Sequence, residues 1–343
     1  MKKKELPVIP SWSPSLNWST TIGGFRPGKV AVLFGPESAG KSLLALMALI
    51  ELQRRDSEAI GIYFDTEFSF NTDLFIKLGG DADRLIVRRS NKPESIFDYI
   101  AGELLEMLQD GAPIKAIVID SIKAIRYPKD IKKISTDQVY AGGGSNYLPS
   151  ALKMIIPVIA EYNLLTFFVT QVGMNLDPMK ALRNPYTLPD GMALKHAADL
   201  MLEITRLDTK AGAVEGGDTI AGGTAQVGHK VRVKVRKNRM GIPARVAQFT
   251  FHYEKGITDI GGEIFELAKS LNIIGKKDGA GNAIYFGEIK LGRGLEDAKT
   301  TVSNDKDLQD DIMEACYAHK DSPIETDASG FVEDKEDYSS VEV

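Results

Sequence analysis

The chain has 343 residues, of which 43% are hydrophobic and 26% charged, so it can form one large domain or two domains with separate cores. Apolar runs stay shorter than the roughly 18 residues that a membrane span needs, and the lysine-rich start lacks the apolar stretch of a secretory signal. The single cysteine, Cys316, excludes an internal disulfide and a cysteine-cluster zinc site, and is typical of a cytoplasmic protein.

The net charge of −5 is unevenly distributed along the chain. Residues 321–343 contain eight acidic residues against one lysine, so the rest of the chain has a net charge of about +2. Because the distribution of charge matters more than its sum, this balance leaves nucleic-acid binding open. We expect the acidic tail at 321–343 to be disordered.

The first two hundred residues alternate short apolar runs with amphipathic stretches, which predicts an α/β fold with a mostly parallel sheet flanked by helices. The expected strands are 29–34, 59–65, 114–121 and 164–171, and the expected helices are 42–55 and 93–110.

Later segments have a different pattern. We predict antiparallel strands at 200–207, 229–238 and 245–254, with the glycine-rich insert 208–228 as a loop. From about Ile260 a small unit follows, with a helix, a hairpin and a second helix. The expected domains are therefore an N-terminal segment at 1–22, a core at 23–258, a small C-terminal domain at 259–320 and the tail.

A phosphate-binding loop, GPESAGKS, lies between the first expected strand and helix. Its pattern places glycines where the backbone must wrap around phosphate oxygens, and the helix that follows directs N–H groups at the anion. Lys41 can reach the β- and γ-phosphates, and Ser42 can bind Mg²⁺. The loop residues are Gly35, Pro36, Glu37, Ser38, Ala39, Gly40, Lys41 and Ser42.

Polar side chains end three of the expected strands, and the carboxyl ends of parallel strands share one edge of the sheet. Asp120 ends one strand and is the expected magnesium ligand. Glu67 follows another strand and is the expected base that activates water, although a helix-capping role is an alternative. Gln171 ends a third strand, where it can hydrogen-bond the γ-phosphate and report its loss.

Together these motifs resemble the RecA/UvsX recombinases of bacteria and their phages. The matching segments are GPESAGKS, YFDTEF, AIVIDS, FFVTQ, the late stretch VRVKVRKNRMGIP and GGEIFELAKSLNII. They follow the family's order over roughly residues 20–290. The resemblance implies a RecA-like core, ATP and Mg²⁺ as cofactors, and a DNA-dependent ATPase that forms helical filaments on single-stranded DNA and promotes pairing and strand exchange with double-stranded DNA. It implies roles in DNA recombination and repair, self-association, and single-strand-binding and mediator proteins as further partners. We expect a phage-encoded protein.

The resemblance assigns Lys237 and Arg239 to the basic pair that reaches the γ-phosphate of a neighbouring subunit. A cation supplied in trans would stabilise transition-state charge and couple hydrolysis to assembly. From the pattern alone, this stretch is also consistent with a strand that has one solvated basic face. Asn71 and Tyr253 fall near the family's adenine contacts, although either can simply pack.

Two long loops, one after Asp120 and one after Gln171, are the expected DNA contacts, through basic side chains that meet phosphates and apolar ones that wedge between bases. The candidates are Arg126, Lys129, Lys132, Lys133, Met174, Met179, Lys180, Arg183 and Lys195.

The short N-terminus departs from the family, because no helix is expected within it and ELPVIPSW can supply at most a docking strand. The alternative function is therefore a hexameric motor of the DnaB or RadA/Sms type, which shares a motif similar to KNRMG. The absent cysteine-rich segment and the domain after the core argue against it. A regulatory protein that binds ATP without turnover is a third possibility, which intact Lys41, Ser42, Glu67 and Asp120 disfavour.

Overall fold

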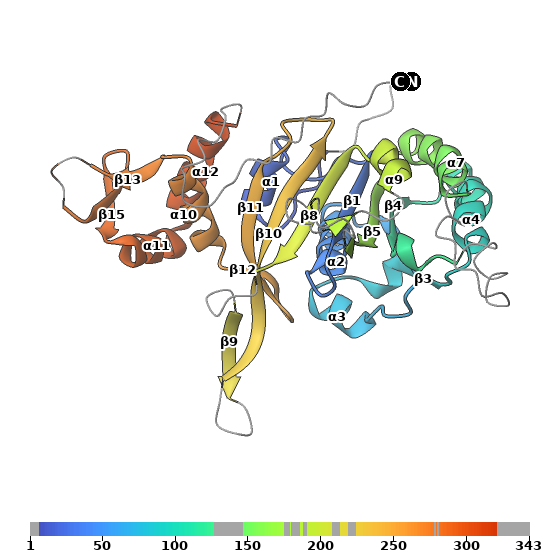
Figure 1. Cartoon of the computed structure of the whole chain (residues 1–343), viewed down its shortest axis with the longest axis horizontal. Helices are drawn as coiled ribbons and strands as arrows, with labels where there is room; N and C mark the ends of the chain where they lie inside the picture. The colour runs from blue at the N-terminus through green and yellow to red at the C-terminus, as the bar shows by residue number, and fades with distance from the viewer. Residues whose placement is uncertain are drawn as a thin grey trace.

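The computed structural model of the chain describes residues 7–126, 147–174, 191–207, 213–218, 224–277 and 281–320, together with Met179, Tyr186, Thr187 and Gly279. Two parts lie side by side in Figure 1, a large α/β core and a smaller unit built from the last described helices and strands. Within these ranges, none of the helices combines the length and apolar character needed to cross a membrane.

The core is built around one large twisted sheet with the order β12-β11-β10-β8-β1-β5-β4-β2-β3, in which β9 pairs with β10. Strands β8, β1, β5, β4, β2 and β3 pair in parallel, whereas β10, β11 and β12 pair antiparallel. The parallel strands are β1 (Val30–Gly35), β2 (Ile60–Asp65), β3 (Leu85–Arg89), β4 (Ile114–Asp120), β5 (Leu165–Gln171) and β8 (Leu200–Arg206). The others are β9 (Ala213–Asp218), β10 (Thr224–Asn238), β11 (Val246–His252) and β12 (Gly256–Thr258).

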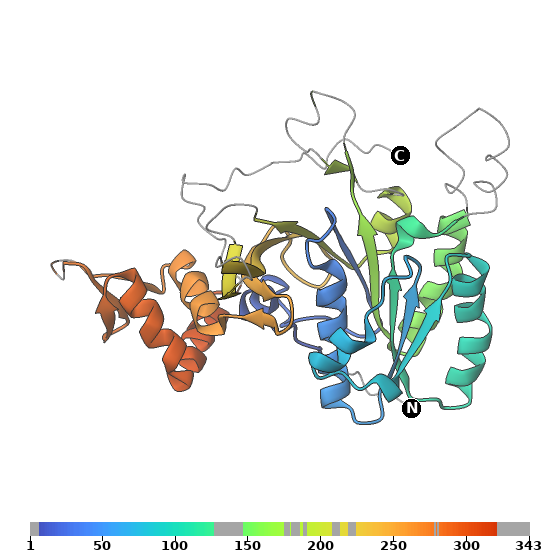
Figure 2. The ribbon, with the colours of Figure 1, turned by 90° about the horizontal axis from the view of Figure 1, so that it is seen from below.

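Helices cover both faces of this sheet, as Figure 2 shows, with α2 and α3 on one side and α4, α5 and α7 on the other. Because the central parallel strands are buried on both faces, they read as continuous apolar runs in the sequence. The helical elements of the core are α2 (Lys41–Arg55), α3 (Thr72–Lys77), η1 (Ala82–Arg84), η2 (Glu94–Asp98), α4 (Tyr99–Ala101), α5 (Glu103–Gln109), η3 (Ile122–Ala124), α7 (Tyr147–Glu161) and α9 (Gly191–Ala197). A short pair, β6 (Gly173–Met174) with β7 (Tyr186–Thr187), stands apart from the main sheet.

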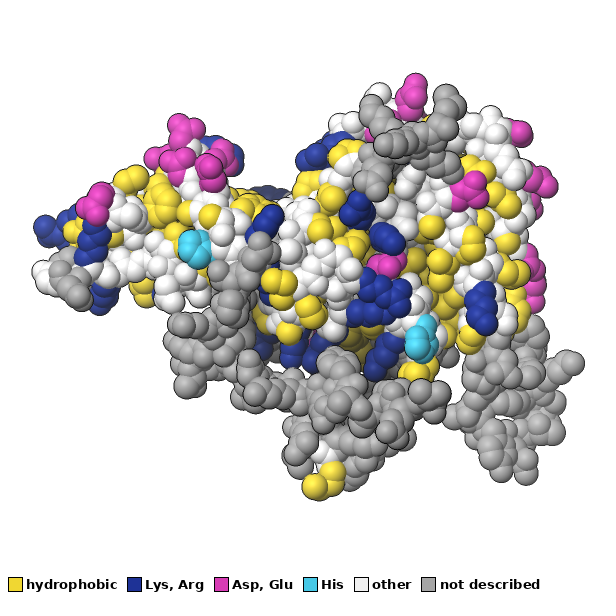
Figure 3. All heavy atoms as spheres, turned by 90° about the horizontal axis from the view of Figure 1, so that it is seen from above, with side chains coloured by type: hydrophobic (Ala, Val, Ile, Leu, Met, Phe, Trp, Pro, Cys, Tyr) yellow, Lys and Arg dark blue, Asp and Glu magenta, His cyan; other side chains and the backbone are white. Residues whose placement is uncertain are grey.

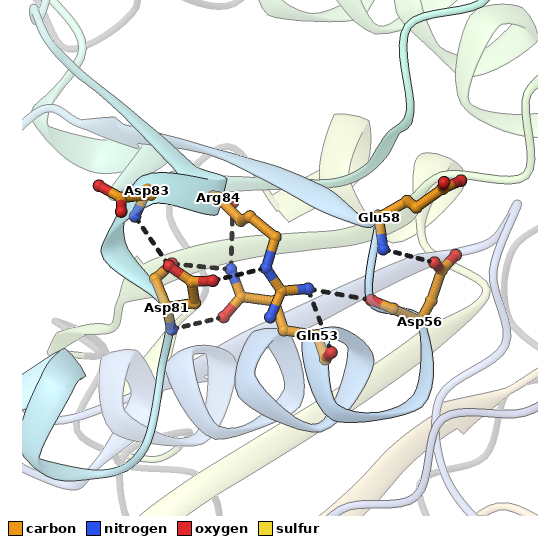
Figure 4. Close-up of polar contacts among 6 residues, drawn as sticks. All are labelled: Gln53, Asp56, Glu58, Asp81, Asp83 and Arg84. Atoms are coloured by element: carbon orange, nitrogen blue, oxygen red, sulfur yellow. Dashed lines mark hydrogen bonds and ion pairs between the residues drawn. The ribbon is translucent and has the colours of Figure 1, made fainter.

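The end of α2 is fastened to the η1 turn by the polar cluster in Figure 4. Arg84 Nη1 donates to the backbone oxygens of Gln53 (3.2 Å), in the last turn of α2, and Asp56 (3.0 Å), directly after the helix. The buried Gln53 amide bonds the backbone of Asp81 in both directions, at 3.0 and 3.1 Å. This cluster fixes the far end of the helix that begins at the phosphate loop.

Two sequence-based predictions need correction in the core. The helix predicted at 93–110 is divided into η2, α4 and α5: its first turn is π-helical, and Gly102, with a non-helical backbone (φ −111°, ψ −96°), separates α4 from α5. The insert 208–228, predicted as a loop, contains β9, which pairs with β10 as an irregular hairpin with two register shifts. Backbone hydrogen bonds form this ladder, and the glycine-rich AVEGGD has no side-chain alternation that would have indicated it.

The smaller unit packs three helices against a three-stranded antiparallel sheet. Its core includes Phe265, Val302, Ile312 and Cys316, all fully buried. Its elements are α10 (Ile260–Ser270), β13 (Ile274–Lys276), β14 (Ala283–Phe286), β15 (Ile289–Arg293), α11 (Leu295–Asn304) and α12 (Lys306–Ala318). The sequence indicated α10, the hairpin and α12, but not α11.

The N-terminal segment contains a helix where none was expected, α1 (Pro14–Ser19), capped by Ser13. It packs between the core and the smaller unit. Trp18 is fully buried and its Nε1 donates to the backbone oxygen of Cys316 at 2.8 Å. Glu263 Oε1 on α10 accepts from Ser13 Oγ and from the Ser15 backbone N–H (2.7 Å). These residues therefore hold the chain's own two parts together.

Candidate functional site

The predicted phosphate loop joins β1 to the N-terminus of α2. Gly35 (φ 153°) and Gly40 (φ 94°) are both required, because a Cβ atom would lie 2.0 Å from the Ile204 oxygen at the first and 2.3 Å from the Phe251 ring at the second. Ser38 also has a positive φ of 57°. The loop is thus a closely packed turn whose shape depends on β8 and β11 as well as on its own sequence.

Lys41 folds back over the loop that precedes it. Its Nζ donates to the backbone oxygens of Gly35 (3.1 Å) and Pro36 (2.5 Å). Burial lowers the pKa of this ammonium group, and the carboxylates of Asp120, Glu67 and Glu37 oppose that shift. The side chain is therefore a buried cation at the centre of an acidic cluster, in position to exchange carbonyl partners for phosphate oxygens.

Asp120 is buried at the end of β4 and meets two hydroxyl groups. Tyr63 Oη donates to its Oδ2 at 2.5 Å, and the Ser42 hydroxyl also hydrogen-bonds the carboxylate. Burial raises the pKa of Asp120, and burial together with the nearby Asp120 charge raises the pKa of Tyr63. Ser42 and Asp120 offer the hard oxygen ligands that Mg²⁺ prefers, so this pair fits the ion that was expected here. Among the described residues, no group of three or more His, Cys, Asp or Glu side chains could hold a metal ion.

The two carboxylates of YFDTEF, one at the end of β2 and one just after it, have different surroundings. Asp65 is 1% exposed and braces the turn, since its oxygens accept from the backbone N–H groups of Ser69 (3.0 Å) and Phe70 (3.1 Å). Glu67 is exposed at the strand edge. Of the two, only Glu67 is free of the turn's own backbone bonds.

Glu67 joins a chain of polar contacts across the ends of three strands. Its Oε1 accepts from Ser121 Oγ (2.5 Å) and from Gln171 Nε2 (3.3 Å). Lys123 Nζ in turn donates to Gln171 Oε1 at 3.5 Å. The structure therefore brings Glu67, Gln171, Asp120 and Lys41 to one edge of the sheet.

Sequence reasoning missed Tyr63, Ser121 and Lys123 in this cluster. Tyr63 alternates with apolar residues in β2 and reads as core, and only the register of Tyr63 opposite Val118, two residues before Asp120, places its hydroxyl at the carboxylate. Ser121 and Lys123 follow AIVID directly, which is a signal that could have included them.

Lys237 and Arg239 lie near the start of β8, at the opposite end of the parallel strands from the phosphate loop. Lys237 pairs with Met201 on β8, and Met201 pairs with Val32 on β1, three residues before Gly35. The Lys237 ammonium donates to the backbone oxygen of Lys195 on α9, and burial, with Arg239 nearby, lowers its pKa. Arg239 Nη2 donates to the His196 oxygen (3.1 Å) and Nη1 lies 3.6 Å from Asp199 Oδ1. Neither side chain faces the phosphate loop of its own chain.

A basic surface lies on the side of the molecule that is uppermost in Figure 1. Figure 3 looks onto that side and shows Lys and Arg side chains gathered in its middle, with Asp and Glu side chains mostly toward its ends. Arg239 is half exposed, and Lys195 is exposed on α9.

For the other predicted site residues, the structure gives less information about their roles. Asn71 caps α3, where its Oδ1 accepts from the Leu74 N–H at 2.9 Å. Tyr253 is 39% exposed and its ring lies 5.6 Å from that of His229. Among the DNA candidates, Arg126 and Met179 are exposed, and Met174 is in β6. Lys129, Lys132, Lys133, Lys180 and Arg183 lie outside the described residues.

Comparisons with known proteins agree with this geometry. Residues 1–258 match the RecA N-terminal domain family. Protein RecA of Aquifex pyrophilus is 31% identical over 90% of this chain and 82% of its own length. Protein RecA of Thermus thermophilus is 29% identical over 94% and 88%, and Protein RecA of Ehrlichia ruminantium is 29% identical over 99% and 88%.

Proposed function

This chain belongs to the RecA family of recombinases, and from that premise we propose that it is a DNA-dependent ATPase that assembles on single-stranded DNA and promotes homologous pairing and strand exchange. Hydrolysis of the phosphoanhydride bond of ATP is the only covalent step, and no DNA bond is broken. DNA recombination and repair are the processes that such an activity serves.

One half of the ATPase site comes from the phosphate-loop edge. The loop amides and the α2 N-terminus bind phosphate oxygens, and Lys41 exchanges its contacts with Gly35 and Pro36 for the β- and γ-phosphates. Ser42 and Asp120 would hold Mg²⁺, which when bound supplies positive charge to the same oxygens. Glu67 accepts a proton from the attacking water, for which it must give up its hydrogen bond from Ser121.

The other half comes from a second copy of the chain. The observation that supports this most strongly is the register of β10, which pairs Lys237 with Met201 and leads to a backbone hydrogen bond from Arg239 to Asp199, away from their own phosphate loop. Side chains held by α9 carbonyls at that end of the strands can meet a γ-phosphate only across a subunit boundary. Cations supplied in trans stabilise the charge that develops during phosphoryl transfer. An arginine supplied in this way raises the rate by about 10³- to 10⁵-fold. Hydrolysis then depends on assembly.

DNA binding is coupled to this site through Gln171 and the strand ends beside it. Gln171 lies between Glu67 and Lys123, and it directly precedes the segment that contains Met179 and Lys195. The loss of the γ-phosphate changes the partners of the Gln171 amide and so the position of that segment. Arg126 begins the other proposed DNA segment. The residues proposed for both loops outside the described ranges, and the base contacts by Asn71 and Tyr253, remain predictions. So do a cytoplasmic location and single-strand-binding and mediator proteins as partners.

Electron microscopy with ATP and single-stranded DNA tests the proposal, together with ATP hydrolysis measured with and without that DNA. We expect open helical filaments and DNA-stimulated hydrolysis, followed by strand exchange between homologous molecules. Closed rings that translocate on DNA would instead indicate a motor.

A further inference from the structure

A polar pocket opens at the carboxyl ends of β2 and β3, next to Glu67. Its volume is about 530 Å³, and it lies between the turn after β2 and the loop after β3. Three cationic side chains line it, Arg88, Arg89 and Lys92, and no acidic residue is among the described residues of its wall. The hydroxyl and amide groups of the wall belong to Ser90, Asn91 and Ser95. The wall therefore offers hydrogen-bond donors and positive charge, which suit an anion.

Intramolecular contacts position these cations without neutralising all of them. The Arg89 side chain is 56% exposed, and its Nε lies 3.4 Å from Asp65 Oδ2 beneath it. The Arg88 guanidinium stacks 3.7 Å above the Tyr99 ring. Lys92 is exposed. Among the described residues, Arg89 alone of the three has a carboxylate partner, and that partner, Asp65, already accepts two backbone hydrogen bonds.

An aromatic ring completes the pocket. Phe68 is 58% exposed and has a φ of 59°, a backbone conformation that is unfavourable for a non-glycine residue. The two backbone bonds to Asp65 brace the turn that holds it. A large ring kept in solvent on a braced turn, next to three cations, has the form of a stacking platform for bases along a phosphate backbone.

The pocket also adjoins the start of the first proposed DNA loop. The backbone N–H of Arg126 donates to the Asn91 oxygen at 2.8 Å, so the chain enters that loop directly from the pocket wall. The phosphate loop, by contrast, lies on β1, and β5, β4 and β2 separate β1 from β3 in the sheet.

We propose that this pocket binds a nucleotide unit of single-stranded DNA, with phosphates on Arg88, Arg89 and Lys92 and a base stacked on Phe68. The inference rests on the proposed function and adds a DNA contact outside the two loops. A strand suits the pocket better than a free nucleotide, because its neighbouring phosphates can continue toward Arg126.

Photocrosslinking and affinity measurements on the full chain with ATP test the proposal. An oligothymidylate with one 5-iododeoxyuridine should crosslink to the tryptic peptide 56–77, which contains Phe68. In anisotropy titrations, the double variant Phe68→Ala/Lys92→Ala should bind the oligonucleotide roughly tenfold more weakly, the size expected for one stacked base and one phosphate contact. The salt dependence should lose about 0.7 from its slope. Phe68→Trp should retain affinity because it keeps a stacking ring.

The matched control is Lys153→Ala/Met154→Ala, which removes an exposed lysine and an exposed apolar side chain from α7. If the unaltered chain binds the oligonucleotide and both double variants bind it equally, the pocket assignment is wrong while the proposed function stands. If the unaltered chain binds no single-stranded DNA, both fail. Crosslinks confined to other peptides, or equal competition by thymidine monophosphate or by a glutamate peptide, also overturn the assignment to a DNA strand.

Discussion

Glu263 makes a pH-dependent contribution to stability that the structure allows us to estimate. The carboxyl group lies at the seam between α1 and α10, where one oxygen accepts two hydrogen bonds and Oε2 has no partner among the described residues. Burial raises its pKa to about 7 from an ordinary value near 4.5, and hydrogen bonds from Ser13 and Ser15 only partly offset that shift. The folded state therefore favours the protonated form.

The stability that Glu263 contributes decreases as the pH rises, because its pKa is higher in the folded than in the unfolded chain. The unfolded chain loses this proton near pH 4.5 and the folded chain near pH 7, so the stabilisation is complete below pH 4.5 and is lost as pH rises through that window. The folded and unfolded pKa values differ by about 2.5, which at 1.36 kcal/mol for each pKa unit corresponds to about 3 kcal/mol of stability. Glu263→Gln cannot ionise, so its stability relative to the unaltered chain should rise by about 3 kcal/mol between pH 4 and pH 8.

Urea denaturation at intervals across this pH range measures the difference, with tryptophan fluorescence reporting on the buried Trp18 at the same seam. Glu266→Gln is the matched control, because Glu266 lies on the same helix and is largely exposed. A free-energy difference between Glu263→Gln and the unaltered chain that stays constant with pH would refute the reasoning.

Three further substitutions test the site and its support. Gly40→Ala should abolish nucleotide binding, because its Cβ would lie 2.3 Å from the Phe251 ring; wild-type affinity in equilibrium binding would contradict that packing. Lys41→Ala should abolish ATP hydrolysis while circular dichroism stays unchanged, and full activity would mean that the phosphate site lies elsewhere. Gln53→Ala should lower the free energy of unfolding by about 1 kcal/mol by leaving partly buried backbone groups of Asp81 without their partner, whereas Glu58→Ala, on the exposed rim of the cluster, should change little.

The sequence predicted four of the six parallel strands closely, because those four are largely buried on both faces and end at polar residues of the candidate site. Strand β8, predicted as antiparallel, pairs antiparallel with β10 but parallel with β1. Strand boundaries at β1, β2, β4 and β5 fall within one residue of the predicted ones, and Glu67 and Gln171 come together as the strand-edge argument requires. Strand ends in a parallel sheet share an edge whatever the loops do, so this part of the site follows from order and pattern alone.

What the sequence did not predict depends on contacts between distant segments. α1 is too short to have a periodic pattern. The contacts that hold it in place are made with Glu263 and Cys316, which lie about 250 residues or more later in the sequence. β3 alternates weakly because it is an edge strand of intermediate exposure. The separation of Lys237 and Arg239 from their own phosphate loop is likewise a matter of register, which the alternation of β10 leaves open.

The central claim is that each ATPase site is shared between two subunits, and mixed assemblies test it most directly. Glu67→Gln removes the base but keeps the basic pair, whereas Lys237→Ala/Arg239→Ala keeps the base and removes the pair. Each variant alone should hydrolyse ATP at least about a hundredfold more slowly than the unaltered chain on single-stranded DNA. In a one-to-one mixture, about a quarter of randomly assembled boundaries combine an intact Glu67 with an intact Lys237 and Arg239, so we predict recovery of up to that share of activity. Activity in the mixture no greater than the average of the two variants alone would contradict a shared site.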